Sequence, residues 1–357
     1  MARRVRVGII GLGRSGRDIH GRHLVTVPGK YDLVAVADRL APRRDRAARE
    51  FGCRTYARPD SLLAQDDLDL VVVASPSRQH VSHAIRALRS GHNVLCEKPV
   101  ARKLSEVEEI ERTARRAGRT FAAFHQQRYN PAFVQVRKVI RSGVLGRIVM
   151  IRLSANSFSR RWDWQTLRRE YGGTLLNTGS HYVDQLLRLL DSDRMPDITC
   201  SMDRANTLGD AEDHVKVMMR RRGHPTIDLE ISGCCAFPGQ HLNIHGTRGG
   251  LVADAGEVRW RYFRSREQTR RILTTEPIAD AAGLPQYCRD DLKWHEDSWT
   301  PSDGSAMAQA VSQYYDMLHR TLTRGRKLEV TMAEVKQQVA VMEECHRQCP
   351  PASMGTP

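Results

Sequence analysis

The stretch Val5-Arg6-Val7-Gly8-Ile9-Ile10-Gly11-Leu12-Gly13-Arg14-Ser15-Gly16 stands near the start of the chain. Its first half is an apolar, β-branched run, which predicts a buried strand. Gly11, Gly13 and Gly16 then have the spacing needed for a tight turn, for close approach of backbone to a pyrophosphate, and for close packing of a helix on the strand. A phosphate there would meet unpaired backbone N–H groups at the start of a helix. The stretch therefore predicts a strand–turn–helix unit that binds a dinucleotide.

The alternative is a glycine turn that merely joins a strand to a helix. The next predicted strand, residues 32–37, favours the dinucleotide because it ends at Asp38, twenty-two residues after Gly16. This carboxylate would accept hydrogen bonds from the adenosine ribose hydroxyls, which favours NAD. Arg39 follows directly, and a guanidinium there could pair with the 2′-phosphate of NADP, so NADP stays open.

Residues 1 to about 125 alternate β-branched runs with amphipathic helices. This pattern is typical of a parallel sheet covered on both faces, so we expect an α/β protein whose residues 1–125 form a doubly wound Rossmann domain. Further strands are predicted at residues 70–74, 93–96 and 120–124. A helix is predicted around residues 80–90, with Gly91 as its C-cap, and a second runs from a capping box of Ser105 and Glu108 to about Ala117, stopped by Gly118.

The composition changes after this point. A strand is predicted at residues 146–153, followed by an aromatic loop and a helix that Gly172-Gly173 opens and that runs to about Leu190. Residues 197–263 are β-rich and split by glycines, which indicates a mostly antiparallel sheet. Helices close the chain at residues 306–324 and 332–347. We therefore expect an α+β domain for substrate binding and oligomerisation at residues 126–349, and a flexible Pro/Ser/Gly-rich tail at residues 350–357.

The chain length and the hydropathy limit which class of protein this can be. A chain of 357 residues is too long for one ordinary core, so two domains are expected. Apolar runs such as residues 70–74 are far too short to cross a bilayer, and the basic N-terminus lacks the apolar stretch of a signal peptide. We expect a cytoplasmic protein without a membrane partner.

The net charge and the cysteines raise two further kinds of partner, nucleic acid and a metal ion. The formal net charge of +15 raises nucleic acid, but the basic residues are spread along the chain and interleaved with acids. A solvated arginine-rich surface is the favoured interpretation, and no nucleic-acid partner is expected. The eight cysteines form no CxxC pair, and nothing completes a tetrahedral site around Cys345, His346 and Cys349, so no metal is expected.

A cation stands at the end of another predicted strand. Lys98 follows Val94-Leu95-Cys96-Glu97 and precedes Pro99. Open α/β sheets bind ligands at the carboxyl ends of their strands, and Pro99 keeps Lys98 out of helical geometry. The alternative is an ordinary solvated Glu97–Lys98 pair. The position at the edge of the cleft favours a functional lysine.

A histidine is predicted on a separate helix. Asn177, His181 and Asp184 are spaced i, i+4 and i+7, so they are expected on one helix face, beside an apolar stripe that packs inward. The polar stripe would then lie where the core meets the cleft. A histidine in such a place is often only a packing residue, so His181 alone would be a weak indication of catalysis.

Together these motifs resemble the Gfo/Idh/MocA family of nicotinamide-dependent oxidoreductases, and the similarity covers nearly the whole chain. The matching segments are Val7 to Gly13, Ser75-Pro76 with His80, Glu97-Lys98-Pro99, Gly172 to His181, and His245 to Gly250. The resemblance implies that Lys98 contacts the reacting oxygen and that His181 accepts or donates the proton. Its implied cofactor contacts are Gly11, Leu12, Gly13, Arg14, Ser15, Gly16, Asp38, Arg39, Ser75, Pro76, His80, Glu97, Lys98 and Gln126.

One catalytic position departs from the family pattern. Position 177 is commonly aspartate in the family, whereas this chain has Asn177. An amide can hydrogen-bond a substrate or orient a neighbour, but it cannot stabilise an imidazolium as a carboxylate does. We interpret Asn177 as a catalytic-site residue of a different substrate branch.

Several residues are candidates for the substrate side. Tryptophan faces suit the apolar side of a sugar ring, and arginines at 160, 161, 168 and 169 could hold an anionic group, which leaves a phosphorylated or nucleotide-linked sugar open. Equally, the tryptophans could anchor a loop to the second sheet. The proposed substrate contacts are Lys98, Arg128, Trp162, Trp164, Arg168, Asn177, His181 and Tyr182.

The activity implied by the resemblance is hydride transfer between NAD(P) and a secondary alcohol or ketone on a sugar, cyclitol or sugar derivative. Two alternatives remain: a non-catalytic dinucleotide-binding regulator, and a glycoside-cleaving enzyme that uses NAD for transient oxidation. Retention of both Lys98 and His181 argues against the regulator, since a sensor needs no such pair. The resemblance also implies a homodimer or homotetramer that forms through the open face of the second sheet.

Overall fold

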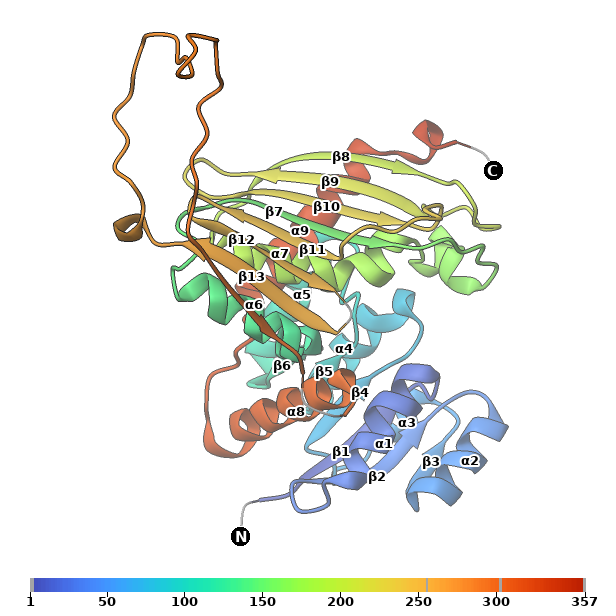
Figure 1. Ribbon diagram of the computed structural model, residues 1–357. Helices are drawn as coiled ribbons and strands as arrows, with labels where there is room; N and C mark the ends of the chain where they lie inside the picture. The colour runs from blue at the N-terminus through green and yellow to red at the C-terminus, as the bar shows by residue number, and fades with distance from the viewer. Residues whose placement is uncertain (1–2, 255, 302–303, 356–357) are drawn as a thin grey trace.

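The computed structural model describes residues 3–254, 256–301 and 304–355. Two sheets organise this part of the chain, with helices between them (Figure 1). The first sheet is built by the N-terminal third of the chain and the second by the residues after it. This is the expected α/β architecture of a Rossmann domain followed by an α+β domain.

The first sheet has six parallel strands in the order β3-β2-β1-β4-β5-β6. The order reverses between β1 and β4, and crevices at such a switch point are where open α/β sheets bind ligands. The sequence predicted five of the strands and missed β3, a short edge strand. The bounds are β1 Val5–Ile10, β2 Tyr31–Ala37, β3 Arg54–Tyr56, β4 Leu70–Val73, β5 Asn93–Cys96 and β6 Phe121–Ala123.

Helices connect these strands. Their bounds are α1 Arg22–Thr26, α2 Ala41–Phe51, α3 Pro59–Leu63, α4 His80–Arg89 and α5 Leu104–Ala117. The predicted capping box of Ser105 and Glu108 is wrong. The Glu106 carboxylate instead accepts hydrogen bonds from the backbone N–H groups of Arg102 and Lys103, both at 2.9 Å, so the helix begins at Leu104 and Ser105 already lies in its first turn. Gly118 ends the helix with φ +61°, as predicted.

The second sheet has eight strands in the order β14-β13-β12-β11-β7-β10-β9-β8. All neighbours are antiparallel except β7 and β10, which confirms a mostly antiparallel sheet. The bounds are β7 Ile148–Asn156, β8 Asp197–Asp203, β9 His214–Arg220, β10 Thr226–Ser232, β11 Leu242–Gly246, β12 Gly249–Asp254, β13 Glu257–Phe263 and β14 Trp294–Trp299.

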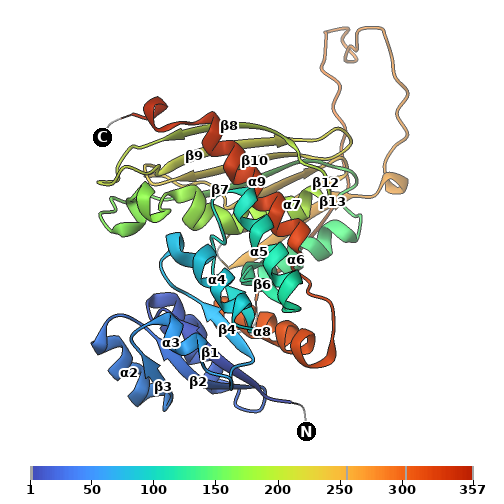
Figure 2. The ribbon, with the colours of Figure 1, turned by 180° about the vertical axis from the view of Figure 1, so that it is seen from behind.

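Helices cover one face of this second sheet. They are α6 Pro131–Arg141, α7 Ser180–Leu190 and α9 Met332–Gln348, and they lie on the face turned toward the Rossmann domain (Figures 1 and 2). No helix of the described residues covers the other face. Alternation along the strands follows from this: Leu242 and Ile244 on β11 are buried, whereas Asn243 and His245 between and beyond them are not.

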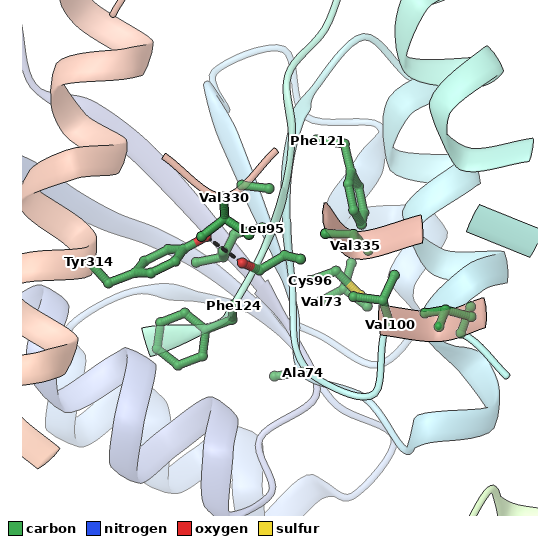
Figure 3. Packing of buried hydrophobic residues seen from close by; sticks show 14 of the residues in the cluster. Val73, Ala74, Leu95, Cys96, Val100, Phe121, Phe124, Tyr314, Val330 and Val335 are labelled. Carbon is green, nitrogen blue, oxygen red and sulfur yellow. Dashed lines mark hydrogen bonds between the residues drawn. The ribbon is translucent and has the colours of Figure 1, made fainter. Parts of the chain in front are cut away.

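The remaining helix, α8 Ala306–Arg324, belongs to the C-terminal part of the chain but packs on the first sheet. The Tyr314 hydroxyl donates to the carbonyl oxygen of Ala123 at the end of β6 (2.6 Å), and its ring meets Phe124 edge-on at 4.9 Å (Figure 3). The Tyr31 hydroxyl on β2 donates to the Tyr315 carbonyl oxygen. We keep a boundary near residue 125 as a proposal for the domain division, with α8 packed across it.

The tail begins with a short turn at Pro351–Ser353, and the Gly355 N–H donates to Asp203 on β8. Flexibility of residues 350–357 stays a prediction, and residues 356–357 lie outside the described part. Within residues 3–254, 256–301 and 304–355, no helix has the length and apolar character that crossing a membrane requires.

Candidate active site

The glycine turn after β1 lies at the carboxyl edge of the first sheet. Gly11 has φ +94°, and a Cβ there would lie 2.6 Å from the carbonyl oxygen of Ala74 on the neighbouring chain segment. A Cβ at Gly16 would lie 1.9 Å from the Gly11 carbonyl oxygen. Gly13 differs because nothing lies within 4 Å of its would-be Cβ. Gly11 and Gly16 therefore make the turn, while Gly13 leaves its outer side free for a ligand to approach the backbone.

The helix after the turn starts in a wide π-helical form at Ser15–Gly21 and continues into α1. Arg14 and Ser15 begin this helix. Asp38, at the end of β2, is buried, and its carboxylate accepts the backbone N–H of Leu12 (2.8 Å) and that of Leu40 (2.9 Å). Asp38 thus links the glycine turn to the end of β2. In a dinucleotide site, this carboxylate is the group that binds the ribose.

Two of the arginines after β2 contact Asp38. The Arg43 guanidinium is 3.4 Å from Asp38 Oδ2, and Arg44 donates to the Asp38 carbonyl oxygen at 2.8 Å. Arg39 is exposed. Asp38 and the exposed Arg39 therefore both lie at the end of β2, and their roles toward a ribose and a 2′-phosphate stay predictions.

Two buried histidines, His80 and His83, hold the loop after β4 in place. Ser75 is buried and its hydroxyl lies 2.9 Å from His83 Nδ1, whereas Pro76 is exposed. His80 is buried between two backbone carbonyls, with Nδ1 2.7 Å from the oxygen of Pro99 and Nε2 2.8 Å from that of Ser75. Burial lowers the pKa of His80. His80 therefore holds the loops after β4 and β5 together rather than facing the cleft with a free ring nitrogen.

Glu97 is a buried carboxylate at the end of β5. Its Oε1 lies 3.2 Å from His20 Nε2, and His20 Nδ1 lies 2.7 Å from the Tyr315 hydroxyl on α8. Glu97 Oε2 accepts the backbone N–H of Lys98 at 3.1 Å. Burial alone would raise the pKa of Glu97, but the hydrogen bond and charge of His20, with the Lys98 charge, lower it to about 2. Glu97 therefore stays ionised beneath the lysine.

Lys98 connects the two halves of the chain. Its Nζ donates to the Asn177 carbonyl oxygen at 2.9 Å and lies 3.4 Å from Asn177 Oδ1. Burial lowers the pKa of Lys98, and the charges of Arg14 and Arg161 lower it further, while Glu97 opposes them. Lys98 and Asn177, which belong to separate motifs of the sequence, therefore contact each other.

The helix that carries His181 is less regular than the spacing predicted. Leu175–Gly179 form a π-helical turn before α7 begins at Ser180. Asn177 therefore lies in the π-helical turn, whereas His181 and Asp184 lie in α7. Asn177 instead faces Lys98, and its Nδ2 lies 3.4 Å from Gln165 Oε1.

His181 lies on the first turn of α7, and its Nδ1 is buried without a hydrogen-bond partner among the described residues. Burial holds the pKa of His181 well below 6.5, and the charge of Lys98 is the next largest cause. His181 is therefore a neutral imidazole near Lys98, able to accept a proton.

His125 is a site residue that the sequence analysis missed. It is buried, and within the described residues neither of its ring nitrogens has a partner. Cys96 on β5 is in register with Ala123 on β6, so Lys98 and His125 each follow that pair by two residues on neighbouring strands. The signal was available, because His125 follows the end of a predicted strand just as Lys98 does. Gln126, beside it, is also buried and has an unpartnered Oε1.

These unpartnered buried atoms allow a test of the cofactor's fit. An unpaired polar atom that is shut away from water costs about 1–3 kcal/mol, so such atoms are usually satisfied by a ligand or water. His125, Gln126 and His181 present them at the carboxyl edge where Lys98 lies, and Gly13 leaves room for phosphate on the same edge. The residues present therefore fit a dinucleotide that runs from the glycine turn to Lys98.

Arg128 was predicted on the substrate side, and the structure corrects this. Its guanidinium is buried and donates to Asp184 through Nε (2.7 Å) and Nη2, and to Glu334 through Nη1 (2.7 Å). Arg188 donates to the same Glu334 carboxylate. With its nitrogens bound to protein oxygens, Arg128 ties η3 Gln126–Tyr129 to α7 and α9.

Replacing Arg128 with Met is expected to destabilise the fold by about 3–5 kcal/mol, because Asp184 and Glu334 would lose the cation that compensates their burial. Chemical denaturation measures this loss. The control is Arg54→Met, which breaks an exposed pair with Asp67 and should cost less than about 1 kcal/mol. Equal stability of the two variants would contradict the structural role of Arg128.

The substrate side has a loop between β7 and the π-helical turn. Trp162 is 79% exposed and Trp164 is 43% exposed, so neither anchors the loop by burial. Arg168 donates its backbone N–H to Asp210, and its guanidinium contacts the sulfur of Met354. Tyr182 packs on the core with its ring edge-on to His241 at 5.4 Å, which points it toward the sheet.

Arg161 and Gln165 are connected to Asn177, the partner of Lys98. Arg161 Nη2 donates to Gln165 Oε1 at 2.6 Å and to Asp163 at 2.6 Å, and Gln165 Oε1 also lies near Asn177. Nothing in the spacing of Gln165 marked it in the sequence. Among the described residues, no cluster of three or more His, Cys, Asp or Glu side chains could hold a metal ion.

Comparisons with known proteins identify the family of this chain. Residues 5–125 match the family model described as "Oxidoreductase family, NAD-binding Rossmann fold", and residues 133–252 match the "GFO/IDH/MocA C-terminal domain". The chain is 30% identical to the inositol 2-dehydrogenase of Acidothermus cellulolyticus, covering 87% of this chain and 91% of that one.

Two further relatives extend over almost the whole chain. The scyllo-inositol 2-dehydrogenase (NADP(+)) of Bacillus subtilis is 27% identical, with 95% of this chain and 92% of the relative covered. The crystal structure of GenD2 from gentamicin A biosynthesis, in complex with NAD, superposes with a TM-score of 0.77 at 23% identity and covers 98% of this chain and 95% of that one. The cofactor is NAD, with NADP as the alternative. The chain is an NAD(P)-dependent oxidoreductase that belongs to the Gfo/Idh/MocA family.

Proposed function

We propose that this protein is a dehydrogenase that oxidises a secondary alcohol, or reduces the matching ketone, on a sugar, cyclitol or sugar derivative. The observation that carries the proposal is the hydrogen bond between Lys98 at the end of β5 and Asn177, four residues before His181. The Lys98 charge is also one of the causes that lower the pKa of His181. The bound nicotinamide supplies the chemistry of accepting or donating the hydride at the reacting carbon.

His181 accepts the hydroxyl proton in the oxidation, since its imidazole is neutral and its environment keeps it so. Lys98 donates a charge-assisted hydrogen bond to the oxygen as negative charge develops on it. Glu97 keeps a negative charge beneath Lys98, and the Asn177 carbonyl oxygen fixes the direction of Nζ. The Asn177 amide has only long contacts of 3.4 Å, to Lys98 and to Gln165, and a substrate hydroxyl could replace them.

His125 has a positioning role in this proposal. Burial and the Lys98 charge lower the pKa of His181 most, and the neighbouring His125 imidazole lowers it further. Asp184 acts in the opposite direction on the pKa of both histidines, and Arg128 holds its carboxylate. His125 therefore helps to keep His181 neutral, whereas a carboxylate at position 177 would stabilise the imidazolium.

Arg161, Trp162 and Arg168 are proposed to meet the part of the substrate that does not react. Arg161 is the strongest of the three, because its charge reaches Lys98 and because it is hydrogen-bonded to the Gln165 that contacts Asn177. An anionic sugar derivative fits this guanidinium, and the exposed indole of Trp162 offers a face to a sugar ring.

A screen of cyclitols, free sugars and sugar nucleotides with NAD and with NADP tests the proposed function. Reduction of either cofactor by a member of the panel supports it. Release of free sugar from a glycoside without net cofactor reduction would instead support the glycoside-cleaving alternative. Cofactor binding without turnover of any substrate would count against a dehydrogenase of this class.

The pH profile of oxidation is expected to have a broad plateau. His181 has a pKa below 6.5 and must be neutral, so activity should persist as the pH falls through 6.5 and be lost only below it. Lys98 has a pKa below 10.5 and must be charged, so activity should decline before the pH reaches 10.5. The ratio kcat/KM measured against pH checks both limbs, and an acid limb centred above pH 6.5 would contradict the assignment of His181.

We also propose a homodimer or homotetramer. The face of the second sheet that carries no described helix has a hollow lined by Phe263, Trp294 and other residues of β11 to β14. A second copy would cover this face.

A further inference from the structure

A long connection between β13 and β14 leaves the body of the molecule. We call residues 264–293 the arm. It starts after Phe263, which pairs with Trp294 at the edge of the second sheet, and it extends well beyond that sheet (Figure 1). The arm is drawn near the viewer in Figure 1, where the uncovered face of the sheet is in front, and far from the viewer in Figure 2. It therefore projects on the side of the uncovered face.

The arm has a defined shape of its own. At its base, the Lys293 N–H donates to Gln268 Oε1, and at mid-length Arg271 forms a 3.0 Å ion pair with Asp290 across the two legs. At its tip, the Asp280 carboxylate accepts the backbone N–H groups of Ala282 and Leu284, both at 2.9 Å. These contacts link the two legs to each other and not to the body of the chain.

Its apolar side chains have no cover in a single chain. Leu273 is 92% exposed and Tyr287 is 99% exposed, and Ile272 and Leu284 are exposed as well. Large apolar side chains gathered on one projecting element mark a contact with another macromolecule, because monomeric proteins rarely leave them in water. The charge of the arm indicates the chemistry of that partner.

The arm is almost neutral in a strongly basic chain. The whole chain carries +15, whereas the arm has six basic and five acidic residues. The uncovered sheet face beside it is balanced too: it has a hollow of about 1060 Å³ in which Arg259 and Arg261 lie with Glu296 and Asp297, and the Arg261 guanidinium lies 4.8 Å from the centre of the Trp294 ring. Two copies of a +15 chain repel over most of their surface, but this side lacks that repulsion.

From these observations we propose that the arm grips a second copy of this chain seated on the uncovered sheet face, with Leu273 and Tyr287 as the apolar anchors. In a two-fold contact each copy offers the same patch, so each arm would lie along the other subunit. The inference rests on the homo-oligomer proposed above and deepens it, because it assigns the contact to a named segment.

Sedimentation velocity over a range of protein concentrations tests the proposal on the full chain. The double variant Leu273→Asp/Tyr287→Asp should weaken self-association by at least about thirtyfold, the effect of losing a buried aromatic anchor. The matched control is Leu208→Asp, a 70% exposed leucine outside the arm, which should associate like the parent chain. A variant with residues 270–290 replaced by a short Gly/Ser linker should behave like the double variant.

The possible results distinguish the role of the arm from the presence of an oligomer. An oligomeric parent whose arm variants associate equally well would overturn the role of the arm while leaving the oligomer in place. A parent that stays monomeric at every concentration would overturn both. Neither result bears on the dehydrogenase activity, which the substrate screen decides independently.

A label on Cys288 gives a second measurement. This thiol is exposed on the arm, and an environment-sensitive fluorophore attached to it in a Cys234→Ser background should change its emission as the protein concentration rises. The same fluorophore on exposed Cys234 in a Cys288→Ser background is the control. Emission from the Cys288 label that does not depend on concentration would overturn the proposal.

Discussion

Replacing Lys98 with Met is expected to lower turnover by at least about a hundredfold while the chain still binds its cofactor. Methionine keeps much of the length of the lysine side chain but removes the ammonium that would stabilise the developing alkoxide. It also removes the 2.9 Å hydrogen bond to the Asn177 carbonyl oxygen, which fixes the lysine across the two domains. The Glu97 carboxylate would lose the neighbouring charge of Lys98, although its hydrogen bond to His20 remains.

Steady-state kinetics with the substrate found in the screen measures the loss, and fluorescence titration of NADH measures cofactor binding. The control is Lys138→Met, which removes an exposed lysine on α6 and should leave both quantities unchanged. A Lys98→Met variant within a few-fold of the parent rate would remove Lys98 from the mechanism.

Replacing His181 with Ala is expected to cause a loss of similar size, because no proton acceptor would remain at the start of α7. The acid limb of the pH profile should disappear with it, since that limb reports the imidazole. Cofactor binding should persist, because His181 lies on the second domain and the glycine turn and Asp38 lie on the first.

The comparison uses His245→Ala, which removes an exposed histidine on β11. It should retain the parent rate and the parent pH profile. If His181→Ala keeps the acid limb, the titrating group is another residue, and His125, buried next to it, is the first to test.

The fold could be predicted where local pattern and packing coincide. The buried strands of the first sheet are continuous apolar runs, so β1, β2, β4 and β5 were found with errors of one residue or none. The edge strand β3 was missed because Arg-Thr-Tyr is short and half-exposed and therefore carries no apolar run. The arm and β14 were also missed, since a connection that makes few contacts with its own chain leaves no period in the sequence.

The site was predicted in outline but not in detail. Lys98 and Asn177 meet as the pattern suggested, whereas Arg128 turned inward because Asp184 and Glu334 offered it two carboxylates from α7 and α9. The partners of an arginine depend on elements far apart in the chain, and no local spacing records them. The π-helical turn at Leu175–Gly179 had no sequence signal that we recognised.

The position of α8 has a consequence for the order in which the molecule is completed during synthesis. Tyr314 and Tyr315 lie some two hundred residues downstream of the first sheet. The Tyr314 hydroxyl donates to Ala123, the Tyr315 hydroxyl contacts His20, and the Tyr315 ring and carbonyl oxygen contact Tyr31. A nascent chain that has left the ribosome only as far as β6 has all six parallel strands but still lacks the rings that seal them. The nucleotide-binding half of this protein is thus finished late, by residues translated after the other half has been made.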